Sequence, residues 1–131
     1  MKKIIYLILF LALLFGGYNV WRVMRAPVQP PVAQQSKIQV REKIVLGETG
    51  EFKEYEVASD TTALELLQQT AQVKVQGEGT NAFVTEINGR AGDVKRKEYW
   101  SFNLNGSPAG VGAGSYSLQE GDQIEWKIVG F

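Results

Sequence analysis

The stretch at residues 99–106, Tyr-Trp-Ser-Phe-Asn-Leu-Asn-Gly, constrains the fold more than any other part of the chain. Successive side chains of a β-strand point to opposite faces of a sheet, so its strict alternation predicts one strand with two different faces. The first face is large and apolar, and consists of Trp100, Phe102 and Leu104. The second face is polar and uncharged, and consists of Tyr99, Ser101 and Asn103. Because Asn105 and Gly106 tolerate positive φ, we expect the strand to end in a turn there.

Other segments repeat this alternation and place the strand in a sheet. Strands are predicted at residues 38–46, 52–57, 83–87 and 124–128. A helix is predicted after the cap candidates Ser59, Asp60 and Thr61, and its apolar face consists of Ala63, Leu64, Leu67 and Ala71. Whether residues 73–76 pair in the sheet is left open. The pattern predicts an α+β, β-grasp-like domain of two layers, in which one helix covers a mixed, mostly antiparallel sheet of about five strands.

The N-terminus differs sharply from the rest of the chain. Two lysines precede an unbroken apolar run at residues 4–15, and the segment 4–21 approaches the length of a membrane-spanning helix. Tyr18 and Trp21 are typical of a membrane interface, and Arg22 and Arg25 of its flank. No pair of small residues marks a cleavage site, which favours a retained signal anchor over a cleaved signal peptide. Secretion after cleavage is the alternative.

A proline- and glutamine-rich segment at residues 26–36 contains three of the four prolines and no charge. This composition is typical of an extended, semi-rigid tether. The predicted organisation is therefore an anchor at residues 1–25, a linker at 26–36 and a folded domain at 37–131. That domain is expected outside the cytoplasm of a single-pass membrane protein.

Composition excludes several classes of function. The chain contains neither histidine nor cysteine, which removes thiol nucleophiles, Cys/His metal sites and the commonest general base near neutral pH. The part after residue 25 has ten basic and fourteen acidic residues, a net charge of −4, which disfavours nucleic acid. The glycine-rich segment 107–117 lacks the lysine of a phosphate-binding loop. We expect no enzyme activity, no metal site and no cofactor.

Four motifs occur in an ordered series: Thr-Ala-Leu-Glu-Leu-Leu at 62–67, Phe-Val-Thr-Glu-Ile-Asn-Gly at 83–89, the 99–106 stretch, and Gly-Asp-Gln-Ile-Glu-Trp at 121–126. Together they resemble the transcobalamin and intrinsic-factor C-terminal-like domain, a family of secreted or membrane-tethered bacterial domains. The resemblance covers residues 38–128 and implies a soluble-ligand-binding β-grasp, with cobalamin as a candidate ligand. The matched residues that look architectural are Trp100, Asn105, Gly106, Gly121, Asp122 and Trp126.

Two functions remain open at this point. The first is a non-enzymatic binding module for a corrinoid or another soluble ligand, because aromatic faces and neutral hydrogen-bonding groups suit such a solute. Its candidate ligand-binding residues are Tyr99, Ser101, Asn103 and Tyr116. An ordinary solvated sheet face would carry the same residues. The second function is a structural domain that docks onto another cell-envelope protein or a surface polymer, through a sheet edge or through residues 107–117.

Overall fold

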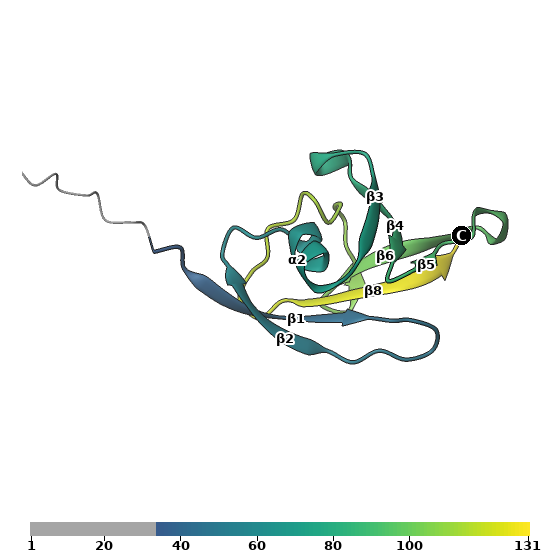
Figure 1. Cartoon of the computed structure of the whole chain (residues 1–131). Coiled ribbons are helices and arrows are strands. Elements are labelled where there is room, and N and C mark those ends of the chain that lie inside the picture. The colour runs from purple at the N-terminus through teal and green to yellow at the C-terminus, as the bar shows by residue number, and fades with distance from the viewer. Residues whose placement is uncertain (1–33) are drawn as a thin grey trace, which may run out of the picture. The chain divides into compact units, whose positions relative to one another are not determined.

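The structure, a computed structural model, describes residues 34–131, of which Gln35–Phe131 form one compact unit. Its elements are β1 (Lys37–Ile44), β2 (Lys53–Ala58), α2 (Ala63–Thr70), β3 (Val73–Gln76), η1 (Gly79–Asn81), β4 (Phe83–Ile87), β5 (Arg90–Ala91), η2 (Val94–Arg96), β6 (Glu98–Leu104), β7 (Ser107–Pro108) and β8 (Gln123–Gly130). Figure 1 shows α2 lying across the strands of the larger sheet. The predicted α+β class is confirmed.

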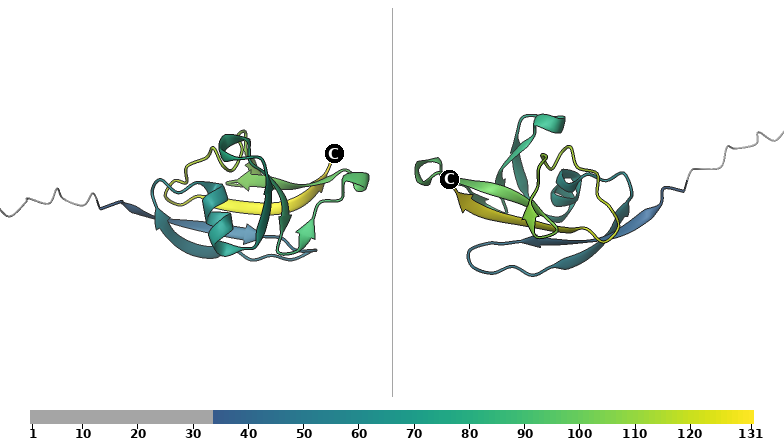
Figure 2. Two further views of the ribbon diagram at one scale, coloured as in Figure 1. Left: turned by 45° about the horizontal axis from the view of Figure 1, so that its top comes forward. Right: turned by 180° about the vertical axis from the view of Figure 1, so that it is seen from behind.

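The larger sheet has five strands in the order β2-β1-β8-β6-β7. β1 pairs with β8 in parallel, and the remaining pairs are antiparallel. The first and last long strands of the domain are therefore neighbours at its centre. The two views of Figure 2 show the same arrangement, with β8 between β1 and β6.

A second, three-stranded sheet stands beside the helix, in the order β3-β4-β5. Residues 73–76 do pair, but with β4 in this smaller sheet and not with the larger one. The single sheet expected from the sequence is thus divided in two. A register shift between Lys74 and Val75 breaks the simple alternation, so Val84 and Ile87 are the buried residues of β4.

The helix begins one residue later than the sequence indicated. Thr62 is the N-cap: its hydroxyl accepts from the Glu65 amide at 3.2 Å, and the Glu65 carboxylate accepts from the Thr62 amide at 2.7 Å. This is a capping box. The predicted caps Ser59, Asp60 and Thr61 were wrong, because the Thr61 amide instead closes a turn onto the Ala58 carbonyl at 3.0 Å.

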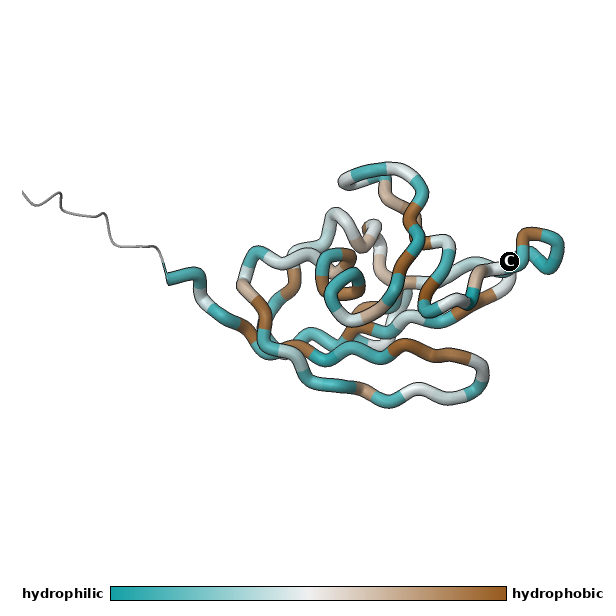
Figure 3. The backbone as a smooth tube through the Cα atoms, viewed as in Figure 1, coloured by the Kyte–Doolittle hydropathy of each residue, from teal (hydrophilic) through white to brown (hydrophobic). Residues whose placement is uncertain are grey.

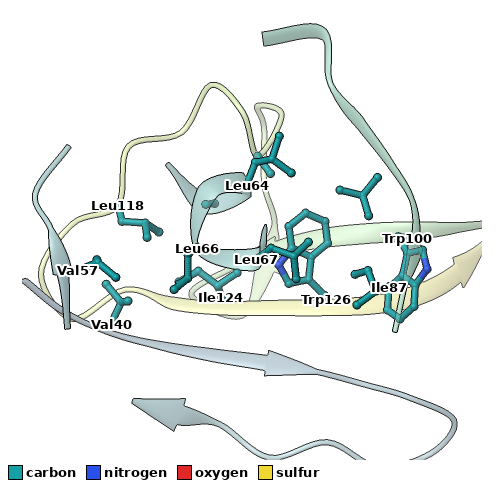
Figure 4. Packing of buried hydrophobic residues seen from close by; sticks show 13 residues of the cluster. Val40, Val57, Leu64, Leu66, Leu67, Ile87, Trp100, Leu118, Ile124 and Trp126 are labelled. Atoms are coloured by element: carbon teal, nitrogen blue, oxygen red, sulfur yellow. The ribbon is translucent and has the colours of Figure 1, made fainter. Parts of the chain in front are cut away.

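The core lies between the helix and the larger sheet (Figure 4). Leu66 is buried as well as the predicted Leu67, so the helix buries a wider face than its spacing suggested. Trp126 stacks on Phe102 with ring centroids 5.2 Å apart. Trp100 is buried, and its indole N–H donates to the Arg90 carbonyl at 2.8 Å, which satisfies its one polar atom.

No helix within residues 34–131 is long and apolar enough to cross a membrane. The predicted anchor at residues 4–21 and most of the predicted linker lie outside the described residues.

Candidate functional site

The polar face of β6 is not an open surface. Ser101 and Asn103 are 8% and 5% exposed, although both are polar. They stand opposite Lys127 and Glu125 of β8 in the antiparallel ladder, so the long side chains of these neighbours share their face of the sheet. A ligand that approached this face of the sheet would therefore reach Ser101 and Asn103 only after charged side chains moved aside.

Those charged side chains form a cross-strand cluster. Glu125 makes ion pairs with Lys43 of β1 and, at 3.4 Å, with Lys127. Its hydrogen bond to Lys43, followed by its hydrogen bond to Lys127, holds the pKa of the Glu125 carboxyl below its usual value. The Lys43 ammonium also lies 4.6 Å from the ring centre of Phe52. Glu125 is thus shared by two lysines, and these paired side chains cover the polar face of β6.

Tyr116 lies on the other face of the sheet. Its ring centre is 6.3 Å from that of Phe102, and its hydroxyl donates to the Asp122 carboxylate at 2.9 Å. Burial, together with the hydrogen bond to Asp122, raises the pKa of the Tyr116 phenol. The structure therefore does not bring Tyr116 together with Tyr99, Ser101 and Asn103. The four residues do not form one surface.

Asp122 organises the end of the sheet near Tyr116. Besides the Tyr116 hydroxyl, its carboxylate accepts from the Gln119 amide at 2.8 Å and from the Asn105 side-chain amide at 3.0 Å. Asn105 adopts a left-handed conformation at φ 51°, and its side-chain oxygen accepts from the Gln123 amide at 2.9 Å. The motif residues Asn105 and Asp122 thus join two turns that follow different strands.

Tyr99 is the one predicted site residue that borders an open hollow and is itself only half-buried. This hollow, about 220 Å³ in volume, lies between β4, β6 and the loop 109–113, and we call it the edge hollow. Its lining has no charged residue, and consists of Ala82, Phe83, Val84, Tyr99, Trp100, Ser101, Phe102, Pro108, Ala109, Val111, Gly112, Ala113 and Trp126. Large side chains at its rim remain in contact with water, since Phe83 is 49% and Val111 52% exposed.

The floor of the edge hollow contains unpaired backbone groups of β6. The Asn105 amide donates to the Gln123 carbonyl of β8, so backbone groups at odd-numbered positions face β8 and those at even-numbered positions face the opposite edge. At that edge the Phe102 carbonyl accepts from the Ala109 amide at 3.0 Å. The amide and carbonyl of Trp100 have no such partner among residues 34–131. A donor and an acceptor are therefore left without a strand partner on the edge of β6 that borders this neutral, aromatic hollow.

Glycine keeps the far wall of the hollow close to the rest of the domain. A Cβ atom at Gly114 would lie 2.3 Å from the Gly79 carbonyl oxygen, so only glycine allows this loop to pack against η1. The glycine-rich segment therefore acts as a packed wall in this structure. No group of three or more potential metal-ligating side chains occurs in the part of the chain that the structure describes.

Comparison with solved structures identifies the fold. Haptocorrin in complex with Cbi is similar over 71% of this chain, with 22% sequence identity and a TM-score of 0.62. A protein from Ruminococcus gnavus to which metal binding has been ascribed is similar over 72% of this chain and 98% of its own length, with 17% identity and a TM-score of 0.60. These likenesses define a transcobalamin-like fold, as the sequence motifs implied. This chain spans only 25% of the haptocorrin chain.

Residues 60–129 match the family described as "Domain of unknown function (DUF4430)", and the chain belongs to that family. The match begins just before α2 and ends within β8, so it contains the edge hollow. A search of curated proteins found no match.

Sequence reasoning did not identify Phe83 and Val111 as site residues. The sequence placed Phe83 only within the predicted strand at residues 83–87, and the register shift in the β3–β4 pair leaves Val84 and Ile87 buried and Phe83 exposed. Val111 is the one large apolar side chain among the glycines and alanines of residues 109–114. A single large apolar residue in such a loop is the feature of the sequence that could have indicated a role in binding.

Proposed function

We propose that the domain is a non-enzymatic binding module that holds a neutral, amide-bearing ligand against the edge hollow. The observation that carries this proposal is the unpaired amide and carbonyl of Trp100 in an uncharged hollow with an aromatic lining. Such a site favours an apolar body with a few hydrogen-bonding groups at its rim. A corrinoid meets this description, as do other soluble ligands of the same chemistry.

The likeness to haptocorrin supports this proposal at the level of the fold, since that protein was crystallised with Cbi. The half-buried Tyr99 and the exposed Phe83 would contact the ligand directly. Ser101 lines the same hollow, whereas Asn103 and Tyr116, which the sequence also suggested, do not. We therefore place Tyr99 and Ser101 in the binding site and assign Tyr116 to the support of the Asp122 turn.

Replacing Phe83 by Ala is expected to weaken corrinoid binding about tenfold, roughly 1.4 kcal/mol, because the side chain is a large aromatic contact at the rim. The measurement is equilibrium dialysis of the full-length protein in detergent micelles against cobalamin and cobinamide. Val94→Ala is the matched control, since Val94 is 87% exposed and lies outside the hollow. If the unaltered protein binds neither corrinoid at high micromolar concentration, it does not act as a corrinoid binder on its own.

A second function is favoured by the same open edge. An unpaired strand edge can accept an extended segment of another protein as an additional strand, so the domain could dock onto another cell-envelope protein or a surface polymer. A pull-down from solubilised membranes is expected to recover a stoichiometric partner in that case. If the pull-down recovers no such partner and the protein binds a corrinoid, the ligand-binding function is supported and the docking function is not.

We also propose that residues 4–21 anchor the protein in the cell membrane, with the folded domain outside the cytoplasm. The supporting feature is the apolar run between Lys3 and Arg22. N-terminal sequencing of the protein from the membrane fraction is expected to find the anchor segment retained. A mature start near residue 27 would instead indicate a cleaved signal and a secreted protein.

A further inference from the structure

A second hollow, about 320 Å³ in volume, shares no lining residue with the edge hollow. It lies between the β1–β2 hairpin and the C-terminal end of α2, which contribute most of its lining. The hydropathy view shows an apolar stretch of chain at the end of β1 (Figure 3). The lining residues are Glu42, Ile44, Leu46, Glu51, Lys53, Tyr55, Thr70 and Asn88.

Glu42 is a buried carboxylate in the wall of this hollow. It is 3% exposed, and one of its oxygens accepts from the Thr70 hydroxyl at 2.5 Å. The other oxygen has no hydrogen-bond partner within residues 34–131. Burial is the largest influence on the Glu42 carboxyl and raises its pKa above the usual value, whereas the Thr70 hydrogen bond and then the nearby Trp126 indole N–H act in the opposite direction. That indole N–H does not reach hydrogen-bond geometry with any described group.

No described cation neutralises Glu42. Lys53 stands opposite it in the β1–β2 ladder, but its exposed side chain makes no ion pair among the described residues. The other charged residue of the lining is Glu51, which is exposed. Tyr55 completes this side of the hollow, and burial followed by the charge of Glu42 raises the pKa of its phenol.

The end of α2 adds to the negative potential of this hollow. The C-terminus of a helix carries a partial negative charge, and cations are favoured beside it. Thr70 is the last residue of α2, and the last turn of the helix has no basic residue to offset this charge. A buried carboxylate, a helix C-terminus and an exposed glutamate therefore surround a space whose remaining walls include Ile44, Leu46 and Tyr55.

We propose that this hollow binds the ammonium group of a small alkylammonium ion, with Glu42 as the counter-ion and the side chains of Ile44 and Leu46 in contact with the alkyl chain. An ammonium group donates up to three hydrogen bonds, and it supplies the positive charge that the Glu42 carboxylate lacks as a partner among the described residues. A divalent metal ion is disfavoured, because the lining offers only two carboxylates and includes the Lys53 ammonium. This site is independent of the proposed ligand in the edge hollow.

The test uses the full-length protein in detergent micelles, titrated with n-butylammonium chloride and followed by two-dimensional amide NMR. Saturable shifts are expected for amides of β1, β2 and the end of α2. Glu42→Gln keeps the size of the side chain and removes its charge, and we expect it to weaken binding at least about tenfold. Lys53→Gln removes a competing ammonium group and should tighten binding several-fold. Titration with n-butanol, which has the same alkyl chain without the charge, should give no saturable shifts.

Equal binding by Glu42→Gln and the unaltered protein would overturn the proposal, and so would equal binding of butanol and butylammonium. If Glu42→Gln does not fold, Lys53→Gln and the pH dependence of the unaltered protein decide instead. Binding should strengthen as pH rises through the raised pKa of Glu42, since only the ionised carboxylate is a counter-ion; a pH-independent affinity would overturn the proposal. Phe83→Ala should leave this binding unchanged, which separates failure here from failure at the edge hollow.

Discussion

Replacement of Trp126 by Ala is expected to lower the free energy of unfolding by about 3–5 kcal/mol, the usual range for a large aromatic residue removed from a core. Trp126 is 2% exposed and stacks on Phe102, so its loss removes a contact between β8 and β6 as well as apolar burial. Trp126 belongs to the same buried cluster as Leu67 of the helix (Figure 4). Because small domains have total stabilities of roughly 5–15 kcal/mol, this change removes a large part of the available stability.

The measurement is urea unfolding followed by circular dichroism, with the unfolding midpoint and slope fitted separately. Phe131→Ala is the matched control, since Phe131 is an aromatic residue that is 80% exposed. That control should change the free energy of unfolding by no more than about 0.5 kcal/mol. A Trp126→Ala loss as small as that of the control would show that the packing between helix and sheet differs from that described.

The second large effect is expected at Asp122. Asp122→Ala leaves the Gln119 amide, the Tyr116 hydroxyl and the Asn105 side-chain amide without their shared acceptor. Unsatisfied donors at a buried site each cost about 1–3 kcal/mol, and two of these three are side chains that can turn toward water. We therefore expect a loss of about 3 kcal/mol in the free energy of unfolding.

A double-mutant cycle separates the contributions at this site. Tyr116→Phe removes one of the three hydrogen bonds and should cost about 1 kcal/mol alone, but much less in the Asp122→Ala background. Glu78→Ala, at an exposed carboxylate whose side chain caps no helix, is the control for the loss of a negative charge. Full additivity of Tyr116→Phe and Asp122→Ala would mean that the two side chains are not coupled.

The fold was largely predictable because its strands carry a local signal. Trp100 and Trp126 alternate with polar neighbours, and both proved to be buried in the larger sheet. The helix face around Leu67 was likewise visible at helical spacing. The cap was missed because three consecutive cap-forming residues precede Thr62, and the choice depends on the turn onto Ala58 and the bridge to Ser117. The bridge to Ser117 joins distant parts of the chain.

The candidate site was less predictable, because it too depends on contacts between segments that are far apart in the sequence. Alternation placed Ser101 and Asn103 on a polar face, but it could not show that Glu125 and Lys127 would stand beside them. It also could not show that the β3–β4 register shift exposes Phe83 next to Tyr99. Which side chains meet across a sheet depends on strand order and register, and neither can be predicted from the sequence of one strand alone.

The parallel pairing of β1 with β8 has a consequence for how the protein is made. Arg41 pairs with Gln123, so β1 cannot pair with β8 until more than eighty further residues have left the ribosome. Contacts so distant in sequence slow folding, because a long loop must close before they form. The β1–β2 hairpin and the helix are therefore expected to lack a complete core until β8 pairs with β1. A chain that must be threaded through a membrane before it folds would benefit from such a delay.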